Sequence, residues 1–204
     1  MFNIAAFRLN IDSFVSRGTI KEGAEYPDGD GVIRRAVDLN TPLQGEGGQL
    51  QGIEIGAKIG LSDYIDAPIW SNFGFDGSFT YSDSSQNSQN LAGEDLPFPD
   101  NSKYSANAAV WYQDDRLQAR IAWNYRTPRL SSTFGQIPIY QDTAQYVDMN
   151  VTYDVNDMVS IYANGSNILG EIEEYHFEFE DGQEQFHSRN QFEPRYSIGV
   201  RAKF

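Results

Sequence analysis

The sequence predicts an all-β fold, specifically an antiparallel transmembrane β-barrel segment of about eight long strands. Three observations support this prediction. Apolar and polar residues alternate with a period of two along most of the chain, which is the pattern of a strand with two different faces. The alternating segments are about 9 to 13 residues long, whereas ordinary strands average about 5 to 6 residues and tilted membrane strands need about 9 to 11. Short and long connections also alternate.

Eight segments carry the alternation. In one of them, Leu117, Ala119 and Ile121 oppose Arg116 and Arg120. In the first segment, Phe7 and Leu9 are among the residues of the apolar face, and Arg8 is expected on the other face. The expected strands lie at residues 5–15, 51–61, 69–81, 103–113, 116–126, 145–155, 159–167 and 195–204.

The connections fall into two groups. The short links are Asp114-Asp115, Asn156-Asp157 and residues 63–68. The long, polar connections span residues 16–49, 82–102, 127–144 and 169–194, and residues 32–39 are interpreted as loop or strand extension. Short turns at one end and long loops at the other are typical of outer-membrane barrels, in which the short turns are periplasmic.

Charge and composition exclude several classes of function. Acidic residues outnumber basic ones 29 to 15, whereas nucleic-acid binding needs clustered Lys and Arg. There is no cysteine, so no disulfide framework is possible. No catalytic motif is present, and we expect no enzyme, no cofactor and no metal site. His176 and His187 lie in the acidic segment 169–194, which is interpreted as a solvated loop rather than a cation site.

Charged residues on the polar faces of the expected strands are candidates for the barrel interior. There they would form a solvated network or contact a plug or a solute. These candidates are Arg8, Glu54, Lys58, Arg116, Arg120 and Arg126.

Large aromatic residues gather near the ends of the expected strands. In a membrane barrel such residues form girdles at the two interfaces; in a soluble sheet they would be core residues or cross-strand pairs. The girdle candidates are Trp70, Tyr81, Tyr104, Trp111, Tyr112, Trp123, Tyr125 and Tyr153.

An ordered series of short motifs resembles the C-terminal barrel region of the TonB-dependent outer-membrane receptors. It begins with Gly52-Ile53-Glu54-Ile55-Gly56 and continues with Leu96-Pro97 and Ser105-Ala106-Asn107. The segments 120–126, 146–157 and 164–170 follow in the family's order, and Gly199-Val200-Arg201-Ala202-Lys203-Phe204 resembles its closing strand. Within that family, the motifs are similar to those of the Xanthomonas–Caulobacter type of receptor.

This resemblance implies a barrel of about 22 strands around a plug, of which residues 1–204 would supply about the last eight strands. The plug domain and the signal peptide are expected to be absent from these residues. The implied place is the outer membrane of a Gram-negative bacterium. The implied partners are membrane lipid, the barrel assembly machinery, the TonB complex acting through the plug, and a solute. That solute would be a small molecule or an oligosaccharide, such as a siderophore, glycan or other nutrient.

The last residues match the assembly signal of outer-membrane barrels. In that signal a polar residue, a glycine and alternating apolar residues lead to a terminal aromatic. Here the matching residues are Ser197, Gly199, Ala202 and Phe204.

Two other architectures fit the strand pattern. One is a self-standing outer-membrane barrel of about eight strands with an interior filled by side chains. The other is a soluble β-rich carbohydrate-binding module, such as a lectin-like sandwich. The first and last strands distinguish the closed barrel from a segment of a larger one, because only the closed barrel pairs them with each other.

Overall fold

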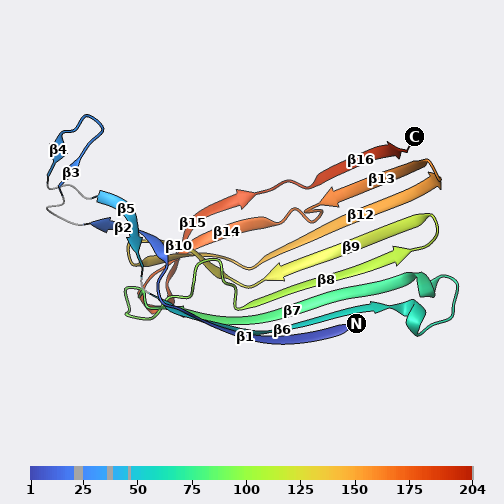
Figure 1. The fold of residues 1–204 in the computed structure, drawn as a ribbon, viewed down its shortest axis with the longest axis horizontal. Helices are drawn as coiled ribbons and strands as arrows, with labels where there is room; N and C mark the ends of the chain where they lie inside the picture. Colours follow the sequence, from blue (N-terminus) through green and yellow to red (C-terminus); the bar gives the residue numbers. More distant parts are fainter. Residues whose placement is uncertain (21–24, 36–38, 46, 204) are drawn as a thin grey trace.

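The computed structural model describes residues 1–20, 25–35, 39–45 and 47–203. Its main element is a sheet of eight antiparallel strands in the order β1-β6-β7-β8-β9-β12-β13-β16. Figure 1 shows these strands side by side, with both termini at the end where the short turns lie. The strands are β1 (Phe2–Ile11), β6 (Gly48–Gly60), β7 (Phe73–Gln86), β8 (Tyr104–Gln113), β9 (Leu117–Arg126), β12 (Ala144–Asn156), β13 (Val159–Ser166) and β16 (Arg195–Ala202).

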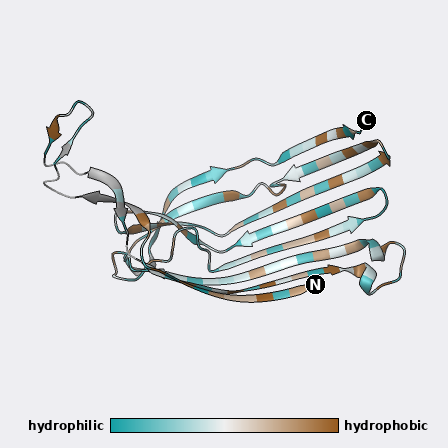
Figure 2. Cartoon of the chain, viewed as in Figure 1, coloured by the Kyte–Doolittle hydropathy of each residue, from teal (hydrophilic) through white to brown (hydrophobic). Residues whose placement is uncertain are grey.

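Each of these eight strands overlaps one of the eight that the alternation predicts, and the all-β antiparallel fold is confirmed. Most are long: β6 and β12 have 13 residues each and β7 has 14. Alternating hydropathy is visible along them in Figure 2. Among the described residues, no helix has the length and apolar character needed to cross a membrane.

Pairing across the sheet separates its side chains into two faces. Directly paired residues share a face, and the register joins Ile55 to Phe79, Val110 to Ile121 and Ile121 to Met149. We call this the apolar face. The opposite, polar face carries Glu54 beside Thr80 and Trp111 beside Arg120. The apolar face is exposed, with Val110 and Ile121 at 53% and 57%.

The two outer strands are not paired with each other. β1 pairs only with β6, and β16 pairs only with β13. The sheet therefore has two open edges among the described strands, and it is not a closed eight-stranded barrel. Unpaired N–H and C=O groups along such edges are sites where further strands can add.

The eight-stranded sheet is a single layer. The chain exposes 14030 Å² of surface, whereas a compact monomer of 23.0 kDa would expose about 9600 Å² by the usual scaling of area with mass. A soluble sandwich would bury one face of each sheet against another sheet. Here the residues on the apolar face remain uncovered, so the arrangement is not that of the lectin-like alternative.

Short turns close one end of the sheet, which we call the turn end. Asp114 caps the β8–β9 turn: its Oδ1 accepts hydrogen bonds from the backbone N–H groups of Arg116 and Leu117, at 2.8 and 2.7 Å. These bonds, led by that of Leu117, hold the pKa of Asp114 below its ordinary value. Asn156 caps the β12–β13 turn in the same way, accepting from the N–H groups of Met158 and Val159.

The other end, the loop end, holds strands where the sequence predicts long loops. A four-stranded sheet has the order β10-β11-β14-β15, and we call it the loop sheet. Two smaller pairs, β2–β5 and β3–β4, lie in the first long connection. The bounds are β10 (Arg129–Phe134), β11 (Ile137–Gln141), β14 (Ile172–Glu178), β15 (Glu184–Gln191), β2 (Val15–Ile20), β5 (Leu39–Gln44), β3 (Tyr26–Pro27) and β4 (Ile33–Arg34).

The small hydrophobic core lies at the loop end. Leu130 in β10 is fully buried, and Ile139 in β11 and Leu96 in the β7–β8 connection are 7% and 3% exposed. The backbone N–H of Asp100 donates to the carbonyl of Leu130 at 2.8 Å, which ties that connection to the loop sheet. The loop sheet therefore packs against the β7–β8 connection, whereas the apolar face of the long strands is uncovered.

A charge placed on the apolar face tests whether lipid covers that face. We expect Ile121→Lys to destabilise the protein in phospholipid vesicles by about 2–4 kcal/mol, the cost of a lysine on the lipid side near the middle of a membrane strand. The matched control is Gln118→Lys, on the polar face of the same strand, which should have little effect. Denaturant unfolding measures both; equal losses would contradict the assignment of the two faces.

Candidate functional site

Charged side chains meet on the polar face, toward the turn end of the long strands. Arg120 in β9 donates from Nη1 to Oδ2 of Asp76 in β7 at 2.7 Å. Trp111 in β8 donates from Nε1 to the other oxygen of the same carboxylate at 3.2 Å. The Arg120 and Asp76 side chains are 50% and 24% exposed, so water screens this ion pair and its contribution to stability is small.

A glycine makes room for the indole. A Cβ atom on Gly74 would lie 2.0 Å from the Trp111 ring, which therefore lies directly on the β7 backbone. The ring can adopt this position only because residue 74 has no side chain.

Beside this cluster the polar face forms a shallow hollow of about 610 Å³. Its lining combines small residues with charged and amide side chains. The lining residues from the sheet include Asn3, Glu54, Gly56, Lys58, Ser78, Thr80, Asn107, Ala109, Ala122 and Asn124.

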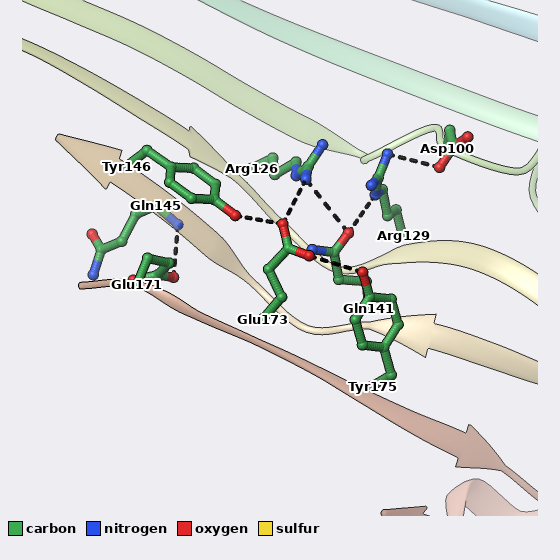
Figure 3. A network of polar contacts seen from close by, with 9 residues as sticks. All are labelled: Asp100, Arg126, Arg129, Gln141, Gln145, Tyr146, Glu171, Glu173 and Tyr175. Carbon is green, nitrogen blue, oxygen red and sulfur yellow. Dashed lines mark hydrogen bonds and ion pairs between the residues drawn. The ribbon is translucent and has the colours of Figure 1, made fainter. Parts of the chain in front are cut away.

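A second polar cluster joins the loop end of the long strands to the loop sheet, and it is centred on Glu173 of β14 (Figure 3). Its carboxylate accepts hydrogen bonds from the hydroxyls of Tyr146 in β12 and Tyr175 in β14, the latter at 2.9 Å. Arg126 in β9 approaches the same carboxylate with Nη2 3.9 Å from Oε1. Glu173 thus links the loop sheet to two long strands.

Gln141 lies in the middle of this cluster and is fully buried. Its Oε1 accepts from Nε of Arg129 at 2.7 Å and from Nη2 of Arg126 at 3.5 Å. Arg129 also pairs with Asp100, 2.7 Å away. The Gln141 Nε2 has no partner of normal hydrogen-bond geometry, although it faces Glu173 closely enough to favour the ionised carboxylate.

The Glu173 carboxyl group is held in its ionised form. Its side chain is 13% exposed, and burial alone would raise its pKa. The hydrogen bonds from Tyr146 and Tyr175 and the positive charge of Arg126 outweigh that effect, so the pKa of Glu173 lies below its ordinary value of 4.5.

A comparison with protein families gives a match to the model described as "TonB dependent receptor-like, beta-barrel" over residues 1–168. The match covers seven of the eight strands of the main sheet, from β1 to β13. The chain belongs to this family. Comparison with curated proteins gave no match.

Two solved structures are similar to the chain. Both are mutants of the ferric enterobactin receptor of Pseudomonas aeruginosa, with TM-scores of 0.60 and sequence identities of 12% and 13%. Each alignment covers 100% of this chain and 29% of that receptor. At this identity the likeness concerns the fold, and the chain spans less than a third of the receptors it resembles.

Three of the six charged candidates for the barrel interior line the same hollow on the polar face: Glu54, Lys58 and Arg120. Arg126 lies on the same face at the loop end, within the Glu173 cluster. Arg116 lies at the turn end, where a hollow is lined by Arg116, Asp154 and Lys203.

The sixth candidate, Arg8, does not lie on the polar face, so its prediction as an interior residue is corrected. It pairs with Gln51 in the register of Ile4 with Ile55, so it lies on the apolar side of the sheet, near the loop end. There its Nη2 donates to Gln49 at 2.9 Å. The alternation of the first strand predicts the wrong face for Arg8, because β1 has apolar residues on both faces.

The eight girdle candidates all lie toward the ends of the sheet. Trp70, Tyr112 and Tyr153 lie at the turn end, and Tyr81, Tyr104, Trp123 and Tyr125 lie on the apolar face toward the loop end. The Tyr81 and Tyr104 rings are 5.5 Å apart, and those of Trp123 and Tyr125 are 5.4 Å apart. Trp111 also lies toward the turn end, but it points to the polar face and binds Asp76, so it is not on the face where a girdle is expected.

Three of the four residues in the terminal motif are described. Ser197 and Gly199 lie on the polar face of β16, and Ala202 lies on the apolar face opposite Val159. The Tyr162 ring lies directly on Gly199, where a Cβ would come within 2.4 Å of it. Phe204 lies outside the described residues, and the role of the motif in assembly stays a prediction.

The acidic segment 169–194, expected to be a solvated loop, instead holds the β14–β15 hairpin. His176 lies 12% exposed, with Nδ1 2.6 Å from Asp142 and Nε2 3.6 Å from Glu184. Within the part of the chain that the structure describes, no group of residues is arranged to hold a metal ion. Sequence analysis missed Glu173 and Gln141 because β11 and β14 are short, and β14 places two glutamates in succession.

The Glu173 cluster should respond to acid. A carboxyl group with a lowered pKa stabilises the fold fully at pH values above the ordinary 4.5 and loses this effect as pH falls through its lowered pKa. We expect hydrogen exchange in β14, corrected for its intrinsic pH dependence, to be slower in the wild type than in Glu173→Gln at pH 6. The difference should shrink as the pH falls below 4.5 and through the lowered pKa of Glu173; a difference that does not depend on pH would contradict this account.

Proposed function

We propose that this chain forms the C-terminal part of the barrel wall of a TonB-dependent receptor in the outer membrane of a Gram-negative bacterium. The observation that carries the proposal is the match of the family to a sheet with one apolar face, one polar face and two open edges. In lipid every backbone polar group must be paired, so both edges must be covered by further strands of the same barrel.

The two faces have different tasks in this proposal. The apolar face contacts lipid, with the aromatic residues at its two ends in the interfacial layers. The polar face lines the interior, where Glu54, Lys58 and Arg120 would contact a plug domain or water. The turn end lies in the periplasm and the loop sheet lies outside the cell, since outer-membrane barrels have short periplasmic turns and long external loops.

The intact receptor would be a transporter rather than an enzyme. It would bind a solute at its loops and plug and import it with force from the TonB complex, which acts through the plug. Assembly machinery would recognise the last strand. The similar solved structures are receptors for ferric enterobactin, which supports a small solute such as a siderophore; an oligosaccharide or other nutrient is the other class we propose. The Xanthomonas–Caulobacter subtype stays a prediction.

Removal of the gene should test this function directly. We expect a strain without it to lose growth on at least one medium in a panel that varies the iron-loaded siderophore or the sole oligosaccharide. Plasmid-borne receptor should restore that growth, and loss of TonB should abolish the restoration. The same strains allow fractionation of the membranes: recovery of the protein outside the outer membrane, or uptake that is independent of TonB, would contradict the proposal.

A further inference from the structure

The Glu173 cluster has the composition of an anion site. Guanidinium groups of Arg126 and Arg129, hydroxyls of Tyr146 and Tyr175 and the amide of Gln141 surround one carboxylate. Arginine and hydroxyl donors of this kind recognise carboxylates through short, charge-assisted hydrogen bonds. The donors come from β9, β10, β11, β12 and β14, so the site is built by two sheets rather than by one local turn.

We propose that this cluster is a carboxylate-binding site for the solute, and that Glu173 is its built-in occupant, which an incoming carboxylate displaces. The proposal rests on the proposed function, because it assigns a chemical class to the solute of that receptor. Displacement of Glu173 removes the hydrogen bond from Tyr146 and the approach of Arg126, which are the contacts of this carboxylate with the long strands.

The unpartnered amide of Gln141 is an independent sign of a ligand. A buried N–H group without a partner costs free energy comparable to a lost hydrogen bond. The Gln141 side chain is fully buried, yet its Nε2 makes no bond of normal geometry while facing the Glu173 carboxylate. Glu173 therefore fills the site incompletely, and a carboxylate that is free to move can satisfy this donor as well.

The site opens onto the polar face of the long strands. A hollow of about 270 Å³ lies beside it, lined by Arg126 and Tyr146 together with Ser105, Asn107, Asn124 and Ala144. All these residues except Ala144 carry hydrogen-bonding side chains. A solute in this hollow can therefore place one carboxylate on Arg126 while its polar body contacts the neighbouring amides and hydroxyl.

The two arginines differ in how far they are already neutralised. Arg129 pairs with Asp100 at 2.7 Å. Among the described residues, the only carboxylate that pairs with Arg126 is that of Glu173, at the longer distance of 3.9 Å, and the Arg126 side chain is 33% exposed. Arg126 is therefore the principal cation for an external carboxylate, and Arg129 holds Gln141 in place.

Succinate is the probe that tests the site, with succinamide as its uncharged analogue. The material is the intact receptor in detergent, at constant ionic strength. We expect Glu173→Ala to bind succinate about tenfold or more tightly than the wild type in calorimetry, because the competing internal occupant is gone. Adding Arg126→Gln should abolish this binding. Adding Arg116→Gln, an arginine at the turn end, should leave it unchanged.

A second measurement uses the wild type and needs no variant to fold. Succinate should speed tryptic cleavage at Arg189 in β15, because displacement of Glu173 loosens the β14–β15 hairpin, and succinamide should not. Equal succinate affinity in the wild type and a folded Glu173→Ala, binding that survives Arg126→Gln, or cleavage unaffected by succinate would each overturn the proposal.

These outcomes are separate from those of the transport experiment. Uptake that depends on TonB, together with no effect of succinate, overturns the carboxylate site and leaves the proposed function standing. Succinate binding at Arg126 without any uptake that depends on TonB overturns the proposed function and leaves the carboxylate site standing.

Discussion

The continuous ladder of backbone hydrogen bonds between long strands is the constraint on which the rest of the structure depends. A strand in hydrocarbon cannot leave its N–H and C=O groups unpaired, because each unpaired group costs several kcal/mol. Seven adjacent pairings satisfy this requirement from β1 to β16. The same ladder turns successive side chains to opposite faces, so one backbone arrangement produces both an apolar surface and a polar surface.

The ladder also explains why so little of the chain is conventionally buried. The long strands have no second layer, and their apolar side chains, such as Ile121 and Ile198, stay uncovered at 57% and 79% exposure. In the proposed receptor, lipid would cover one side of them and the remaining barrel would complete their support. Among the described residues, the large buried apolar side chains lie at the loop end, around Leu130 and Ile139. In the proposed receptor these strands lie beyond the hydrocarbon and must exclude water by themselves.

Alternation predicts the long strands well, because the period of two persists over ten or more residues in most of them. It does not determine which way a strand faces when both faces are apolar. In β1, Phe7 and Leu9 alternate as clearly as Phe2 and Ile4, and only pairing with β6 places Ile4 beside Ile55. For the same reason Arg8 was assigned to the wrong face.

The loop sheet shows a second limit of periodicity. Its strands β10 and β11 have 6 and 5 residues, too few for alternation to stand out from ordinary variation. A bulge between Tyr175 and His176 shifts the register with β15. Trp111 illustrates a related limit: its type suggests an interface, but only the neighbouring Asp76 and Gly74 explain why it turns to the polar face.

The contrast between the two polar clusters follows from where each lies on the ladder. Asp76 and Arg120 lie on adjacent parts of one rigid sheet, half open to water, so their ion pair can break without moving any strand. Glu173 reaches the long strands from a different sheet, and its contacts with Tyr146 and Arg126 are made between elements that no backbone ladder joins directly. A side-chain contact between two separately hydrogen-bonded sheets can be exchanged for a ligand while each sheet stays intact. In the proposed carboxylate site, the junction at Glu173 is therefore the place where an incoming carboxylate can replace an internal contact without breaking a backbone ladder.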